Sequence, residues 1–81
     1  MPSNIMEMKG HKNAITQLAW GNDAFSMFTA SADKLVMAWD MVTGKPSRKF
    51  KGHTAIVNAV HASNDYVVSG ADDYTVKVWD M

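Results

Sequence analysis

One stretch of this sequence is written twice, and the duplication constrains the fold more than any other feature. Residues 29–40 read TASADKLVMAWD and residues 69–80 read SGADDYTVKVWD. The tripeptide KGH precedes each copy, at residues 9–11 and 51–53. His11 and His53 are 42 residues apart, whereas Trp39 and Trp79 are 40 apart. A chain built in this way is expected to fold as two similar units placed side by side.

The length and charge of the chain limit the classes of protein to consider. A compact chain of 81 residues forms one small domain, which buries roughly 60–65 % of the surface that its unfolded chain exposes. Its eight basic and eight acidic residues balance. We therefore expect neither direct binding of nucleic acid nor attraction to a membrane surface.

Targeting signals and cysteines are also absent from the sequence. Residues 1–8 lack the basic start and the apolar run of a signal peptide, and no apolar run approaches the ~18 residues of a membrane span. There is no cysteine, so disulfides and thiolate metal sites are excluded. These features favour an intracellular location, in the cytoplasm or the nucleus.

Short apolar runs bounded by turn residues predict strands rather than helices. No segment has apolar residues at helical spacing over ten or more positions. Turn residues at 21–23 and 63–65 separate the runs, and residues 43–46 are expected to form a linker. The expected strands cover residues 4–8, 14–20, 25–29, 35–40, 47–50, 55–61, 66–69 and 75–80. The predicted fold class is all-β.

The duplicated pattern resembles that of WD40 repeats. In each copy KGH is followed by S/T-x-x-x-D-x-x-x-x-x-W-D, and the two matches cover residues 9–40 and 51–80. The resemblance implies two blades of a β-propeller, each a four-stranded antiparallel sheet, in a single repeat unit of residues 1–81. Residues 1–8 are then expected to be an outer strand that completes a neighbouring blade.

Four residues of each repeat have the donors and acceptors for a hydrogen-bonded network. The Trp indole has one N–H and no acceptor, so a buried Trp39 needs an oxygen nearby. The hydroxyl of Thr29 can accept that proton and donate its own to His11, which can donate in turn to Asp33. The resemblance implies this structural role for eight residues, which are His11, Thr29, Asp33, Trp39, His53, Ser69, Asp73 and Trp79.

Ser69, His53 and Asp73 also have the residue types of a hydrolytic triad. The sequence argues against a triad, because Ser69 is not in a G-x-S-x-G elbow and the same set recurs with Thr29 in its place. His53 and His61 do not have zinc-site spacing, and the single glycines form no phosphate-binding loop. We expect no enzyme, no metal and no cofactor.

Exposed residues beside this network are candidates for contact with partners. In this family a glycine often follows the aspartate, because a positive φ is comfortable for glycine, but here Lys34 and Tyr74 occupy those positions. Strain or a different turn type is expected there. The candidate partner-binding residues are Lys12, Asn13, Lys34, Thr54 and Tyr74.

Two blades are too few to close a propeller, which needs four to eight. The open sheet faces and edges would expose apolar side chains and unpaired backbone groups. Two solutions are open. Three or four identical chains could form a ring in which residues 4–8 of one chain complete the last blade of the next. Alternatively, further repeats of a longer chain could supply the missing neighbours.

The function implied by such a fold is the binding of other proteins. Within the family, residues 28–58 resemble the WD-repeat subunits of spliceosomal small nuclear ribonucleoproteins. The resemblance implies a non-enzymatic scaffold in a spliceosomal particle. A scaffold with an unrelated role, as part of a larger propeller, is the alternative.

Overall fold

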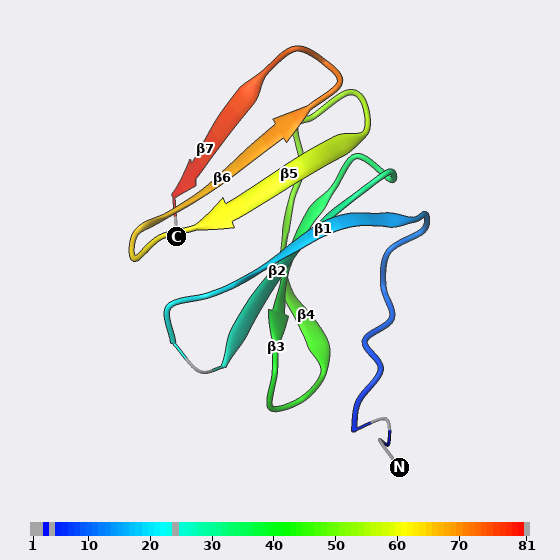
Figure 1. The fold of residues 1–81 in the computed structure, drawn as a ribbon, viewed down its shortest axis with the longest axis vertical. Coiled ribbons are helices and arrows are strands. Elements are labelled where there is room, and N and C mark those ends of the chain that lie inside the picture. Colours follow the sequence, from blue (N-terminus) through cyan, green and yellow to red (C-terminus); the bar gives the residue numbers. More distant parts are fainter. Residues whose placement is uncertain (1–2, 4, 24, 81) are drawn as a thin grey trace.

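The computed structural model describes residues 3, 5–23 and 25–80, and all regular elements within them are strands (Figure 1). No helix in this part of the chain is long and apolar enough to cross a membrane. The strands are β1 (Ile15–Trp20), β2 (Ser26–Ser31), β3 (Val36–Asp40), β4 (Lys45–Phe50), β5 (Val57–Ala62), β6 (Tyr66–Ala71) and β7 (Val76–Asp80).

The seven strands form two antiparallel sheets. The first has the order β1-β2-β3-β4 and the second the order β5-β6-β7. The prediction of an all-β chain with two blades that do not close by themselves is confirmed. The second sheet has three strands because, as predicted, the outer strand of the last blade is not supplied by this part of the chain. The described residues end with β7, so none of them can take the place that β4 has beside β3.

The strand predicted at residues 4–8 is not formed. Residues 5–8 have no strand conformation, and residue 4 lies outside the described residues. A strand needs a neighbouring backbone to pair with, and the first sheet consists of β1 to β4 alone. This segment instead lies against the first sheet, where a Cβ placed on Gly44 would be 3.0 Å from the sulfur of Met6.

The linker expected at residues 43–46 is shorter than predicted, because β4 already begins at Lys45. Pro46 lies opposite Trp39, next to an irregularity between Ala38 and Trp39. Proline has no N–H to give to a sheet, and it is tolerated here because β4 is an edge strand.

The hydrophobic core lies between the two sheets, which pack face to face. Successive side chains of a strand point to opposite faces, so each sheet contributes one face to this core. The buried residues are Phe28, Ala30, Val36, Ala38 and Phe50 of the first sheet, and Val57, Val60, Ala62 and Val67 of the second. Trp79 packs at the border of the core, with its ring centroid 5.5 Å from that of Phe50.

Two polar side chains of β1 join the innermost strands of the two sheets. The hydroxyl of Thr16 donates to the carbonyl oxygen of Val57, and the backbone N–H of Val60 donates to Oε1 of Gln17 over 2.7 Å. These bonds use backbone groups of β5 that face the first sheet rather than β6. They help to fix the position of one blade relative to the other.

Candidate functional site

The turn between β2 and β3 is organised around the carboxylate of Asp33. Its Oδ1 accepts the backbone N–H of Leu35, which holds the turn, and its Oδ2 accepts the backbone N–H of Lys12 over 3.0 Å. Nδ1 of His11 lies 2.8 Å from the same Oδ2. Asp33 therefore connects the loop before β1 to the turn after β2.

A continuous chain of hydrogen bonds runs from this turn into the first sheet. Nε1 of Trp39 donates to Oγ1 of Thr29 over 2.7 Å, and Nε2 of His11 contacts the same hydroxyl. Because Trp can only donate, the Thr29 oxygen accepts and its proton is available to His11. Nδ1 of His11 then carries the proton that is shared with Asp33.

The second repeat builds the same arrangement. Nε1 of Trp79 donates to Oγ of Ser69 over 2.8 Å, and Oγ of Ser69 lies 2.7 Å from Nε2 of His53. Nδ1 of His53 is 2.9 Å from Oδ2 of Asp73. The structure thus brings together all eight residues that the sequence singled out, as two separate groups of four.

Hydrogen bonds keep both aspartates in their charged form. Burial raises the pKa of Asp33, but the bonds from His11 and from the backbone of Lys12 outweigh this effect, so the pKa lies below its ordinary value. The pKa of Asp73 lies well below its ordinary value, chiefly through the hydroxyl of Thr75, with His53 as a further donor. Each histidine thus lies against an ionised carboxylate at neutral pH.

The glycine of each KGH lies against the indole of the same repeat. A Cβ on Gly10 would be 3.1 Å from Cη2 of Trp39, and one on Gly52 would be 3.0 Å from Cη2 of Trp79. Both distances are shorter than ordinary van der Waals contact. The loop before each blade can therefore cross the indole only because it has no side chain at that point.

The arrangement around Ser69 does not fit a nucleophile. Its side chain is 1 % exposed, and its oxygen already has Trp79 and His53 as hydrogen-bond partners. A substrate would have to displace the indole to reach it. Among the described residues there is also no group of three or more His, Cys, Asp or Glu side chains that could hold a metal ion.

The candidate partner-binding residues lie beside the two networks. Lys34 and Tyr74 have φ values of 75° and 68°, and Tyr74 is fully exposed. A positive φ is rare for such side chains, so the turns that present them are strained. Lys12 and Thr54 are exposed and give their backbone N–H groups to the network aspartates. Asn13 caps the N–H of Ala14.

The outward face of the second sheet is apolar and uncovered. Val76 and Val78 are 71 % and 63 % exposed, although their counterparts 40 residues earlier, Val36 and Ala38, are buried between the sheets. We call the surface of Val68, Gly70, Val76 and Val78 the open face of the second sheet.

The first sheet is incompletely covered on the opposite side. Leu18 and Trp20 are 56 % and 62 % exposed, whereas their counterparts Val60 and Ala62 lie in the core. The two exposed surfaces therefore repeat the two faces that already meet in the core. Hydrophobic composition alone had not revealed which positions of the chain would remain exposed.

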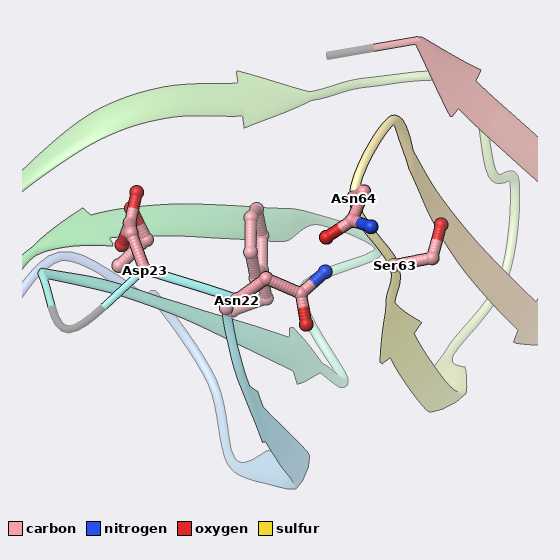
Figure 2. A pocket seen from close by; sticks show the side chains of 7 residues that line it. Asn22, Asp23, Ser63 and Asn64 are labelled. Atoms are coloured by element: carbon pink, nitrogen blue, oxygen red, sulfur yellow. The ribbon is translucent and has the colours of Figure 1, made fainter.

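A hollow of about 300 Å³ lies between the β1–β2 and β5–β6 turns. Figure 2 shows Asn22 and Asp23 on one turn and Ser63 and Asn64 on the other, so the hollow is built by equivalent turns of the two repeats. The ring of Phe28 also lines it. The sequence had marked residues 21–23 and 63–64 only as turns and residues 26 and 28 as part of a strand, although Asn at the same place in both repeats was a visible signal.

Two face-packed antiparallel sheets, each with a Trp–hydroxyl–His–Asp network at the same end, define the class of protein as adjoining blades of a β-propeller. The chain belongs to the WD-repeat family, because the family model described as WD domain, G-beta repeat matches residues 2–40 and 44–80.

One relative is named as a splicing factor and another as a component of a small nuclear ribonucleoprotein. The chain is 41 % identical over 80 residues to pre-mRNA-splicing factor cwf17 of Schizosaccharomyces pombe, a match that covers 95 % of this chain and 24 % of that protein. It is 31 % identical over 80 residues to the U5 small nuclear ribonucleoprotein 40 kDa protein of Dictyostelium discoideum, with 95 % and 22 % covered. Only the second name refers to a ribonucleoprotein particle.

A third relative has a name of another kind. Mitochondrial division protein 1 of Pyricularia oryzae is 29 % identical over 79 residues, with 98 % of this chain and 12 % of that protein covered. The chain thus spans a quarter or less of the length of all three relatives.

Proposed function

We propose that this chain is a non-enzymatic scaffold that binds other proteins as part of a spliceosomal particle in the nucleus. The non-enzymatic part of the proposal rests on Ser69, whose buried hydroxyl group is hydrogen-bonded to both Trp79 and His53. Ser69, His53 and Asp73, which have the residue types of a hydrolytic triad, are therefore bonded within the protein instead of facing a substrate. The similarity to cwf17 and to the U5 40 kDa protein supports the spliceosomal part.

We assign the two networks a structural role. Each one connects the loop before a blade to the third strand of that blade, through side chains that are largely buried. The β2–β3 and β6–β7 turns beside the networks would then bind the partners, because Lys34 and Tyr74 of these turns extend into solvent. A strained turn that presents a fully exposed side chain is typical of a position kept for contact rather than for stability.

Affinity capture from nuclear extract, read by mass spectrometry, tests this role. We expect the full chain to retain spliceosomal proteins, and Lys34→Glu and Tyr74→Ala to retain fewer of them. Lys45→Glu is the matched control, because Lys45 is an exposed lysine at the opposite end of its sheet. Spliceosomal proteins missing from the wild-type eluate, or retained equally by all variants, would contradict the proposal.

The open faces call for further blades, and we propose that they come from identical chains. Surfaces that repeat the two core-forming faces are complementary in a head-to-tail manner, so three chains would give six blades and four would give eight. In such a ring residues 4–8 of one chain would pair with β7 of the next. The alternative is that additional repeats of a longer chain cover the same faces. The greater length of cwf17, of which the match covers 24 %, supports this alternative.

The mass of the folded chain in solution separates these two arrangements. A trimer or tetramer that dissociates when Val78→Lys places a charge on the open face supports the ring. A folded monomer of the wild-type chain would contradict it and leave further repeats as the source of the missing blades.

A further inference from the structure

The hollow between the β1–β2 and β5–β6 turns has the chemistry of a ligand site, which we call the turn hollow (Figure 2). It is lined by residues 21–23, 26 and 28 of the first repeat and 63–64 of the second. Its volume of about 300 Å³ is at the lower end of the range for ligand pockets, which suits one long side chain. Because both walls belong to this chain, the site needs no further blade.

The turn hollow lies at the opposite end of the sheets from Lys34 and Tyr74. β2 begins beside the hollow at Ser26 and ends at Ser31, next to the turn that presents Lys34. Binding here is therefore separate from the capture proposed for the other end. A result at one site does not decide the result at the other.

Two carboxamides in the turn hollow have unused hydrogen-bonding capacity. Asn22 and Asn64 make no hydrogen bond to the described residues, and each offers one carbonyl oxygen and an NH₂ group. Ser63, in contrast, is occupied with the backbone N–H and carbonyl of Tyr66. In Figure 2 the side chain of Asn22 extends toward the turn that carries Ser63 and Asn64.

Among the described residues that line the turn hollow, Asp23 is the only one with a charged side chain. The backbone N–H of Phe25 and the hydroxyl of Ser26 lower its pKa, so it is ionised at neutral pH. These two bonds go to different oxygens and leave further lone pairs on each. None of the described lining residues is Lys or Arg, so the hollow favours a cation and disfavours an anion.

We propose that the turn hollow binds an arginine side chain of a partner protein. A guanidinium has five N–H donors in one plane, and they match a carboxylate and two carboxamide oxygens better than the compact, strongly hydrated ammonium of lysine does. Phe28 lines the hollow but is 3 % exposed, so its ring offers only a small apolar contact to the methylene stem. Arginine satisfies the charge and the unused acceptors together.

A titration of the full chain, followed by NMR of the side-chain NH₂ groups, tests the proposal. The probes are three capped tripeptides, acetyl-Gly-X-Gly-amide, in which X is arginine, lysine or norleucine. We expect saturable shifts at Asn22 and Asn64 with the arginine peptide, binding about fivefold weaker with lysine, and no saturation with norleucine.

Matched variants locate the charge that is recognised. Asp23→Asn keeps an oxygen for the N–H of Phe25, and we expect it to weaken arginine binding about tenfold. Asp65→Asn is the control, because Asp65 is the equivalent residue of the second repeat and does not line the hollow. If Asp23→Asn should unfold, Asn64→Ala replaces it, and we expect severalfold weaker binding.

Three results would overturn the proposal. Equal affinity for the arginine and norleucine peptides would exclude recognition of the guanidinium. Equal binding to the wild type and to a folded Asp23→Asn or Asn64→Ala variant would exclude the hollow as the site. Shifts confined to residues at the Lys34 end would assign the peptide to the other surface.

Discussion

Nε1 of Trp39 lies 2.7 Å from Oγ1 of Thr29, and this bond sets the direction of the whole network in the first repeat. The indole has no acceptor, so the threonine oxygen must accept and its proton must point elsewhere. Nε2 of His11 is positioned to accept that proton, and Nδ1 of His11 then donates its own proton to Asp33. The same order of donors explains why the second repeat can use Ser69 instead of threonine.

Removing the hydroxyl of Ser69 should destabilise the fold. Ser69→Ala leaves the N–H of Trp79 and Nε2 of His53 without their partner, at a cost of about 1–3 kcal/mol in the free energy of unfolding. Urea unfolding measures this cost. Ser69→Thr keeps the hydroxyl, as Thr29 does in the first repeat, and should unfold closer to the wild type. An unchanged midpoint for Ser69→Ala would remove the structural role of the network.

Stability should decrease in acid because of the network aspartates. The folded pKa values of Asp33 and Asp73 lie below the ordinary value near 4. Their contribution is therefore complete above about pH 4 and is lost as the pH falls below that value. Urea midpoints between pH 7 and pH 2.5 measure the loss, and Asp73→Asn should flatten the curve. A wild-type midpoint that is constant over this range would contradict the prediction.

Gly52 and Gly70 should respond differently to alanine. Gly52→Ala places a Cβ 3.0 Å from Trp79, and we expect it to destabilise the chain by about 1–3 kcal/mol. Gly70→Ala meets nothing within 4 Å, and it should be neutral or stabilising by up to about 1 kcal/mol, because alanine restricts the unfolded chain. Thermal unfolding of both variants decides the matter. Equal losses would show that the close approach to the indole is unimportant.

Tyr74 should be a position where glycine is better than alanine. Its φ of 68° disfavours any Cβ by roughly 1–2 kcal/mol, and its fully exposed side chain buries nothing. Tyr74→Gly should be more stable than Tyr74→Ala by up to about 1 kcal/mol, after the greater freedom of glycine in the unfolded chain is subtracted. At Thr54, which has no positive φ, alanine should be the better residue. The opposite order at Tyr74 would mean that the turn is not strained.

Much of the fold follows from local patterns. The runs ending in Trp39-Asp40 and Trp79-Asp80 form the third strand of each sheet, as their β-branched and aromatic residues predict. The positive φ of Lys34 and Tyr74 was foreseeable, since both stand where a repeat of this kind prefers glycine. The start of β4 at Lys45 was not, because proline usually argues against a strand and only its place at a sheet edge makes Pro46 acceptable.

The sequence by itself determined the two units, their strands and the partners within each network, because a duplicated pattern of donors, acceptors and apolar residues has few ways to be satisfied. Only the tertiary structure decided what happens between the units. The bond from Val60 to Gln17, the exposure of Val78 while Ala38 is buried, and the hollow between Asn22 and Asn64 all depend on how one sheet packs on the other. Packing joins residues that are distant in sequence, and no local pattern specifies it.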